Sequence, residues 1–271
     1  MKKFIILITI ILSVSSLHAA TVDTVSIYSS TMKKGLKAVV VTPANYKKDM
    51  SYPVVYLLHG SGGWYSNMII RIPQLKEYAD EYGMILVFPD GGKTNWYFDS
   101  PINDSFRYET YISKEVPAFI DAHYNTIKDR KGRAIAGLSM GGHGALFLGF
   151  RHADFFGACG SMSGAVDLMN LPGKKDVAKL LGDSTAYPDN WKNYSVITVV
   201  EKYPKDSLAI IIDCGTEDFL YKGNVALHAK LLQLKIPHDY IERNGKHEWP
   251  YWRNAVQYQL LFFNNYFKGR K

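Results

Sequence analysis

The sequence predicts an α/β fold in which a mostly parallel, twisted sheet is covered by helices on both faces. Two observations predict it. Short runs rich in β-branched residues alternate along the chain with helix-like segments, and those runs are continuously apolar. Strands with that pattern are buried on both faces, as in parallel sheets. The 271 residues, of which 47% are hydrophobic, are enough for one large core.

The first half of the chain supplies three strands and two helices in alternation. Ala38–Thr42 and Pro53–Leu58 are apolar runs of strand length, and Tyr65–Tyr82 mixes apolar and charged residues as a helix does. Met84–Phe88 is a further short apolar strand, and a helix is expected around Tyr108–Tyr124. The alternation favours parallel strands joined by helical crossovers.

The second half continues this alternation with one interruption. The stretch from Gly164 to Pro204 fits least well, and we expect a small insertion there rather than a second domain. The remaining elements are strands at Arg133–Ala136, Ala158–Met162, Leu208–Ile212 and Asp239–Ile241, and helices at Met140–Arg151, near Asn224–Leu234 and from Pro250 to the end.

The N-terminus has the layout of a secretory signal peptide. Lys2 and Lys3 precede an apolar run from Phe4 to Val14, and small residues follow over Ser15–Ala20. The apolar run is short for a membrane span, so cleavage is expected rather than a retained anchor. We therefore expect residues 1–20 to be removed and residues 21–271 to form one exported domain, periplasmic or extracellular.

Composition excludes several classes of function. The formal charge of +7 is spread along the chain without the clustered basic stripe of nucleic-acid binders, and no later segment is apolar enough to span a membrane. Zinc-protease and nucleotide-binding motifs are absent, so neither a metal nor a cofactor is expected. Cys159 and Cys214 lie in apolar runs typical of free buried thiols, although export leaves a single disulfide open.

The strongest chemical motif is Gly137–Gly141, which reads Gly-Leu-Ser-Met-Gly between a predicted strand and a predicted helix. A sharp turn at this point forces the central serine into a strained conformation with its hydroxyl exposed. Side chains beside the turn would clash, which gives both glycines a steric reason. The motif therefore makes Ser139 the candidate nucleophile.

A serine hydroxyl needs a base to take its proton, and His247 is the candidate. Of the eight histidines, this one follows the last predicted strand, in Asn244–Trp249. That is where the chain order Ser, Asp, His places the base in hydrolases of this fold.

The acid that orients the base is expected after the strand Leu208–Ile212. Asp213, Glu217 and Asp218 compete for this role. Asp213 is close enough to be part of the strand, whereas Asp218 lies in a turn that could reach an imidazole. Spacing alone favours Asp218 and leaves the other two open.

Stabilising the charge on the substrate carbonyl requires backbone N–H donors. We expect one from Met140, the residue after the nucleophile, and the other from the glycine-rich loop His59–Gly63. Within that loop Ser61 is the candidate donor, since it directly follows the His-Gly step.

With these motifs in place, the sequence from about Leu36 to its end resembles the putative-esterase family of α/β-hydrolases. That family includes feruloyl and acetyl xylan esterases, S-formylglutathione hydrolases, siderophore esterases and mycolyltransferases. The resemblance is carried by His59–Gly63, Phe88–Gly92, Gly137–Gly142, Cys214–Leu220 and Gly245–Trp252. It implies an α/β-hydrolase fold, a cofactor-free acyl-enzyme route and, because the family's acid precedes an aromatic-leucine pair, Asp218 as the acid.

The expected substrate is a small-molecule or oligosaccharide ester. Export argues against S-formylglutathione, a cytosolic metabolite, so acetyl or feruloyl esters of plant-type carbohydrate are favoured. Trp96 and Tyr97, in a loop after a strand, are the candidate substrate-binding residues, because their rings could stack on a sugar or phenol; anchoring of the loop in the core is the alternative. An acyltransferase of the mycolyltransferase type, a siderophore esterase and a catalytically silent binding protein stay open.

Overall fold

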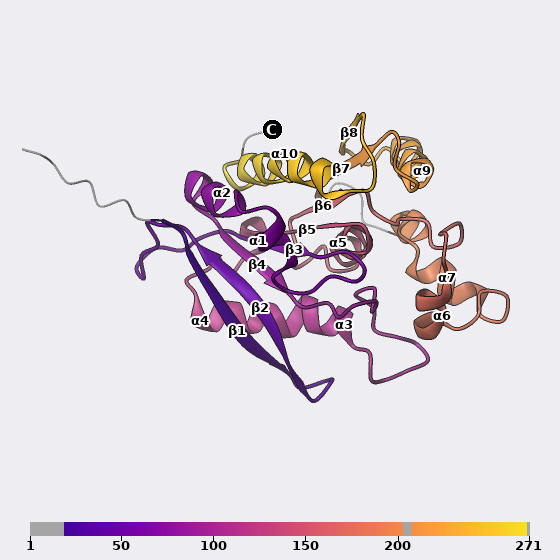
Figure 1. Cartoon of the computed structure of the whole chain (residues 1–271), viewed down its shortest axis with the longest axis horizontal. Coiled ribbons are helices and arrows are strands. Elements are labelled where there is room, and N and C mark those ends of the chain that lie inside the picture. The colour runs from indigo at the N-terminus through magenta and orange to yellow at the C-terminus, as the bar shows by residue number, and fades with distance from the viewer. Residues whose placement is uncertain (1–18, 203–206, 270–271) are drawn as a thin grey trace, which may run out of the picture.

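The computed structural model describes residues 19–202 and 207–269, and its centre is one eight-stranded sheet (Figure 1). The predicted signal peptide therefore lies almost entirely outside the described residues. The strands are β1 (Thr21–Ser29), β2 (Lys34–Thr42), β3 (Val54–Leu58), β4 (Ile85–Pro89), β5 (Arg133–Leu138), β6 (Ala158–Met162), β7 (Ala209–Gly215) and β8 (Asp239–Arg243).

Neighbouring strands follow the order β1-β2-β4-β3-β5-β6-β7-β8. The pairs β1–β2 and β2–β4 are antiparallel, and every pair from β4 through β3 to β8 is parallel. Six strands therefore direct their carboxyl ends to the same edge of the sheet, which is where ligands bind in folds of this type.

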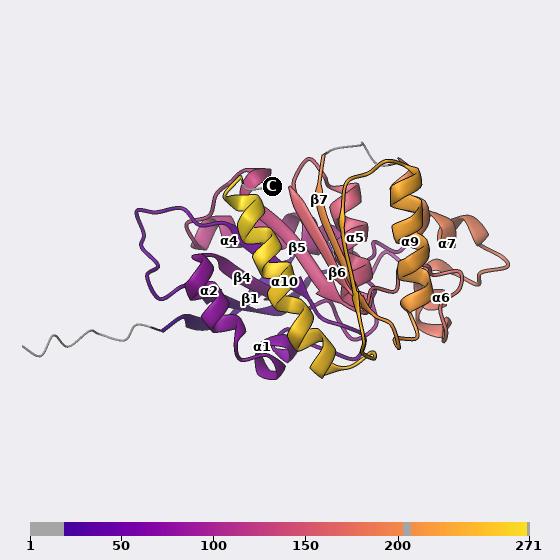
Figure 2. The same ribbon diagram turned by 90° about the horizontal axis from the view of Figure 1, so that it is seen from above.

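The ten α-helices of the described residues lie on the two faces of the sheet or beyond its edge. They are α1 (Asn67–Arg71), α2 (Leu75–Tyr82), α3 (Tyr108–Thr110), α4 (Val116–His123), α5 (Met140–Arg151), α6 (Lys175–Leu181), α7 (Pro188–Tyr194), α8 (Val196–Val199), α9 (Tyr221–Gln233) and α10 (Trp249–Phe267). Figure 2 shows α10 crossing the sheet, with α2 beside it.

The core is divided by the sheet into two layers. Along β2, Val39 and Val41 pack into the layer of α1, α2 and α10, whereas Val40 packs into the layer of α4, α5 and α9. This alternation follows from the two-residue period of a strand. The prediction of a mostly parallel sheet with helices on both faces is thus confirmed.

Three differences from the predicted elements have local causes. The outer strand β1 was not predicted, because most of its residues are exposed and it lacks a continuous apolar run. The single helix expected within Tyr65–Tyr82 is two helices, since Pro73 disfavours helical geometry at Ile72. The helix expected over Tyr108–Tyr124 contains a π-helical turn at Tyr111–Glu115, directly before the helix that carries Pro117.

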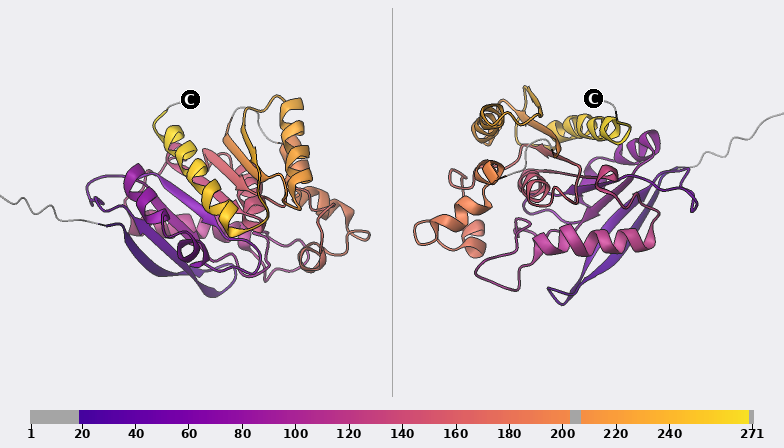
Figure 3. Two further views of the ribbon diagram at one scale, coloured as in Figure 1. Left: turned by 45° about the horizontal axis from the view of Figure 1, so that its top comes forward. Right: turned by 180° about the vertical axis from the view of Figure 1, so that it is seen from behind.

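The insertion after β6 consists of short helices at one end of the molecule, away from the β1–β2 hairpin (Figure 3). Its α8 packs against α5 and α9, so the insertion extends the helical layer. Trp191 on α7 is fully buried and its indole N–H donates to the Gly182 carbonyl at 2.9 Å. Pro204, the predicted end of the insertion, lies outside the described residues. In the described part of the chain, no helix has the length and apolarity to cross a membrane.

Candidate active site

The turn between β5 and α5 holds Ser139 in a strained backbone conformation, with φ 56° and ψ −118°. A Cβ at Gly137 would lie 2.3 Å from the Gly141 carbonyl oxygen, and one at Gly141 would lie 2.2 Å from the Leu58 oxygen. Only glycine fits at both positions, because backbone atoms cannot move aside. The turn therefore presents Ser139 at the carboxyl edge of the sheet, as the motif predicts.

Three side chains from three loops form one hydrogen-bonded chain. The Ser139 hydroxyl lies 2.8 Å from His247 Nε2, and His247 Nδ1 lies 2.8 Å from Asp218 Oδ2. With Nδ1–H donating to the carboxylate, Nε2 is left to accept the serine proton. Asp218 is only 5% exposed, so its charge acts on the imidazole with little solvent screening.

Asp213, the competing acid, does not reach the imidazole. Its carboxylate is fully buried at the end of β7 and accepts from Tyr251 Oη at 2.5 Å and from the Arg243 guanidinium. Glu217, the third candidate, forms an exposed ion pair with Lys246 at 3.8 Å. Of the three carboxylates, Asp218 is the one in contact with His247.

The loops that carry the acid and the base are bonded to each other. The Thr216 N–H donates to the Arg243 carbonyl at 3.0 Å, and the Glu217 N–H donates to the Gly245 carbonyl at 3.0 Å. Gly245 has a φ of 154°, and a Cβ there would lie 2.2 Å from the Tyr251 ring. These bonds fix the distance between the Asp218 and His247 backbones.

Two aromatic rings contact the imidazole of His247. Trp252, which is buried, meets it edge-on at 4.9 Å between ring centroids, and Phe219 lies at 4.5 Å with its side chain 60% exposed. Trp249 contacts Trp252 rather than His247. Phe219 was not among the predicted site residues, although its position directly after the acid was the available signal.

The predicted oxyanion donors lie on either side of the nucleophile. Met140 is the first residue of α5, where backbone N–H groups have no acceptor within the helix. The Ser61 loop is close as well, since a Cβ at Gly60 would lie 3.3 Å from Ser139 Cβ. The next two N–H groups, of Gly62 and Gly63, donate to the carbonyls of Lys93 and Gly60. The roles of Ser61 and Met140 stay predictions that this placement supports.

The interpretation of Trp96 and Tyr97 as substrate-binding rings is wrong, and their burial agrees with the alternative, a loop anchored in the core. Trp96 is 6% exposed and Tyr97 is fully buried, so neither presents a ring face to a substrate. Tyr97 Oη donates to the His59 carbonyl at 2.9 Å, and its ring packs against Gly91 and Gly144. Both residues have positive φ, and the burial of their side chains anchors the loop in the core.

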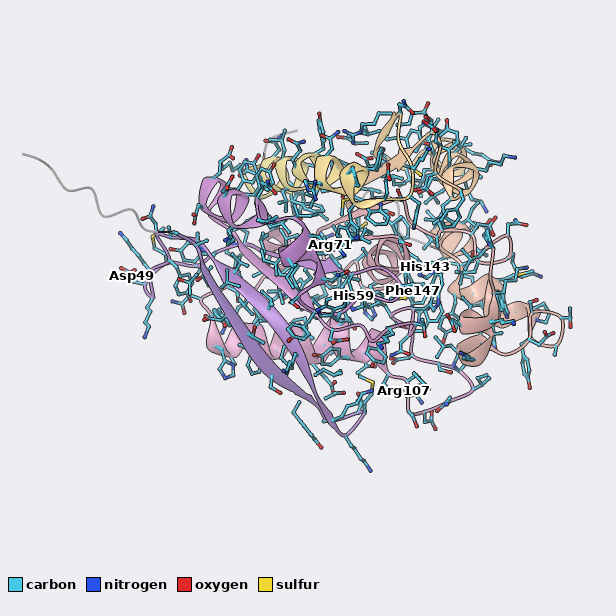
Figure 4. All side chains as sticks on the ribbon, viewed as in Figure 1. Asp49, His59, Arg71, Arg107, His143 and Phe147 are labelled. Carbon is cyan, nitrogen blue, oxygen red and sulfur yellow. The ribbon has the colours of Figure 1, made fainter. Side chains whose placement is uncertain are left out.

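Beneath the site, His143 is buried among aromatic side chains of α5 and the 96–98 loop. Figure 4 shows it beside Phe147, whose ring stacks on it at 5.6 Å. Its Nε2–H donates to the Tyr194 carbonyl at 2.8 Å. Burial lowers the pKa of His143 to about 4, so the ring is neutral at physiological pH.

Neither cysteine is part of the site or of a disulfide. Cys159 and Cys214 are both free and buried. Cys159 pairs with Ile210 across β6 and β7, which places Cys214 about 13 Å farther along the neighbouring strand. Within residues 19–202 and 207–269, no three His, Cys, Asp or Glu side chains are grouped as a metal site.

Several known proteins are similar to this chain in sequence. A model of the family described as "Putative esterase" matches residues 29–263. An acetyl esterase of Caldicellulosiruptor saccharolyticus is 25% identical over 252 residues, covering 86% of this chain and 94% of that protein. The diacylglycerol acyltransferase/mycolyltransferase Ag85A of Mycobacterium gordonae is 28% identical over 241 residues, covering 76% of this chain and 70% of that protein.

Solved structures agree with the sequence matches. A ferulic acid esterase superposes with a TM-score of 0.79 at 30% identity, covering 92% of this chain and 99% of that one. An S-formylglutathione hydrolase from Agrobacterium tumefaciens has a TM-score of 0.81 at 20% identity, covering 93% and 98% of the two chains, which shows the shared fold.

Proposed function

We infer that this chain, which belongs to the Putative esterase family of α/β-hydrolases and is a carboxylic-ester hydrolase, acts through Ser139 on acetyl or feruloyl esters of plant-type carbohydrate. The observation that carries the mechanism is the hydrogen-bonded chain from Ser139 through His247 to Asp218. The substrate class is supported by an acetyl esterase and a ferulic acid esterase among the similar proteins, and export by the signal-like N-terminus.

The geometry gives each side chain a step. Ser139 Oγ attacks the ester carbonyl carbon while His247 Nε2 takes the hydroxyl proton, and the N–H groups of Ser61 and Met140 receive the charge on the carbonyl oxygen. The tetrahedral intermediate collapses when His247 gives that proton to the departing alcohol. Asp218 holds the imidazole in one tautomer and stabilises its protonated form.

Water completes the cycle on the acyl-enzyme. His247 takes a proton from the water, whose oxygen attacks the acyl carbon, and the acid is released as Ser139 regains its proton. The base must be unprotonated for both halves of the cycle.

Replacing the nucleophile tests this mechanism. Ser139→Ala should fold as the wild type does and lose at least about a thousandfold in kcat. A serine-directed organophosphonate should modify the wild type at Ser139, as read by peptide mass spectrometry, and should leave the variant unmodified. Retained turnover in the variant would exclude Ser139 as the nucleophile.

Acyl transfer is the second candidate, and the similarity to Ag85A favours it. The same acyl-enzyme would then be attacked by an alcohol instead of water. Turnover of an acetyl ester with and without a sugar acceptor distinguishes the two, because a transferase forms a new ester while a hydrolase forms free acetate. We expect free acetate as the main product in both reactions.

A further inference from the structure

A pocket of about 360 Å³ opens beside the triad, between the start of the insertion and the first turn of α9. One wall is the chain that follows β6, and the other begins directly after the acid Asp218. Its lining includes Gly164, Asp167, Asn170, Phe219, Lys222 and Gly223. We call it the α9 pocket.

Both walls of the α9 pocket are attached to catalytic residues. On one side the Ala165 N–H donates to the Ser139 carbonyl at 3.3 Å, next to Gly164. On the other side Phe219 follows Asp218, and its ring lies 4.5 Å from the His247 ring. A group bound in this pocket is therefore within reach of the reacting ester.

The position of Phe219 indicates which part of the ester enters. His247 gives its proton to the oxygen of the departing alcohol, so that oxygen must lie at the imidazole. Of the two rings that contact the imidazole, Trp252 is buried and Phe219 is exposed, so the substituent on that oxygen passes Phe219. The pocket is on the alcohol side of the scissile bond.

The lining groups suit a neutral ring that carries hydroxyl groups. Phe219 offers a 60% exposed aromatic face. Asp167 offers carboxylate oxygens held in place by Asn170, whose side-chain N–H donates to it at 2.8 Å, and Lys222 adds donors at the rim. Few polar groups on a largely apolar surface fix the orientation of a ligand.

We propose that the α9 pocket binds the sugar ring that forms the alcohol part of the substrate, with Phe219 against the ring face and Asp167 accepting from its hydroxyl groups. The proposal rests on the proposed function, since it presupposes a carbohydrate ester. It assigns to Phe219 the contact that the buried Trp96 and Tyr97 cannot make.

Gly223 allows the pocket to be filled without touching the triad. A Cβ there would meet only Asp167 Cβ and Val166 Cγ2, both at 3.8 Å, which is ordinary contact. Gly223→Leu therefore adds a side chain that extends into the pocket. Ala229→Leu, on an exposed position of the same helix, adds a similar side chain to solvent and is the matched control.

Two acetyl esters that differ only in the alcohol give the readout: acetylated xylotriose and methyl acetate, followed by acid release. The ratio of their kcat/KM values should fall roughly ten- to a hundredfold in Gly223→Leu and in Phe219→Ala, and should stay at the wild-type value in Ala229→Leu. An unchanged ratio in Gly223→Leu would overturn the proposal.

Further measurements distinguish a failure of the proposed carbohydrate substrate from a failure of the pocket assignment. A wild type that hydrolyses methyl acetate but not acetylated xylotriose would reject the carbohydrate substrate, whatever the variants do. If Gly223→Leu instead impairs methyl ferulate and spares acetylated xylotriose, the pocket holds the acyl group and the assignment to the sugar is wrong. Calorimetric titration of acetylated xylotriose into Ser139→Ala and Ser139→Ala/Gly223→Leu should show binding weakened roughly tenfold or more in the second.

Discussion

At the scale of the residue, the environment of His143 makes the stability of the protein depend on pH. Its pKa is about 4 in the folded state, because burial disfavours the charged ring, against 6.5 for an ordinary histidine. The unfolded chain therefore binds more protons between pH 6.5 and 4, and the free energy of unfolding falls as pH falls through that range.

We expect the protonation of His143 to lower the free energy of unfolding by about 3 kcal/mol between pH 7 and pH 4. His143→Gln keeps a donor for the Tyr194 carbonyl but does not titrate, so its stability should fall less over the same range. Urea unfolding of both proteins at several pH values measures the difference. Parallel curves for the two proteins would show that His143 is not the titrating group.

The acids Asp218 and Asp213 should respond differently to the same substitution. Asp218→Asn should lower kcat by roughly a thousandfold or more, because the imidazole loses the carboxylate that fixes its tautomer. Asp213→Asn should mainly lower the free energy of unfolding, by about 3–5 kcal/mol, because it leaves Arg243 without its buried partner.

Steady-state kinetics together with denaturant unfolding of both variants checks this order. A larger loss of kcat in Asp213→Asn would mean that the acid is misassigned. Each variant replaces one carboxylate oxygen with an amide NH2 group, so the two variants serve as controls for each other.

The sequence predicted the residues of the triad better than the residues around it. Ser139 follows from a local glycine-serine-glycine motif, and His247 follows from its place after the last predicted strand, so both can be assigned without the three-dimensional structure. Spacing favoured Asp218 without excluding Asp213, since only the fold shows that Asp213 is bonded to Arg243 and Tyr251. Whether an aromatic residue in a loop faces solvent depends on backbone angles, which is why Trp96 was misjudged and Phe219 missed.

At the scale of the element, the turn into α5 tolerates no side chain beside Ser139. Gly141→Ala should destabilise the protein by about 3 kcal/mol or more, because its Cβ would meet two backbone oxygens. Gly223→Ala makes the same change in an uncrowded helical position and should stabilise slightly, by about 0.5–1 kcal/mol. Thermal unfolding of the pair measures both, and equal shifts would contradict the packing argument.

The loop through Trp96 should behave as part of the core. Trp96→Ala should lower the free energy of unfolding by about 3–5 kcal/mol, because it leaves a large cavity. Turnover of p-nitrophenyl acetate and of a carbohydrate ester should fall together, along with the melting temperature. A selective loss of the carbohydrate ester in a variant of unchanged stability would restore a role in substrate binding.

At the scale of the whole molecule, the architecture was predictable because strands that are buried on both faces of a sheet are continuously apolar in sequence. The central strands β3 to β7 are continuous apolar runs, and each was predicted close to its observed range. The outer strand β1 was not, because an edge strand with a mostly exposed surface carries no such run. The order of the strands in the sheet was not predicted from the sequence.

The reactivity of the two buried thiols measures whether the native fold is intact. Burial raises the pKa of Cys214 to about 12 and raises that of Cys159 further, so neither forms the reactive thiolate at neutral pH. Ellman's reagent should detect no thiol in the native protein and two thiols after unfolding in guanidinium chloride. Rapid reaction of one thiol in the native state would show local opening of β6 or β7.

The strained backbone at Ser139 lowers the stability of the folded protein. A left-handed conformation at a residue with a Cβ costs about 1–3 kcal/mol, a sizeable part of the stability of a typical domain. Ser139→Gly should therefore be more stable than Ser139→Ala, although both lack the hydroxyl. A chain that served only as a binding protein would gain stability from glycine here and lose nothing. The serine therefore lowers the stability of the fold, as is expected of a residue that serves catalysis rather than packing.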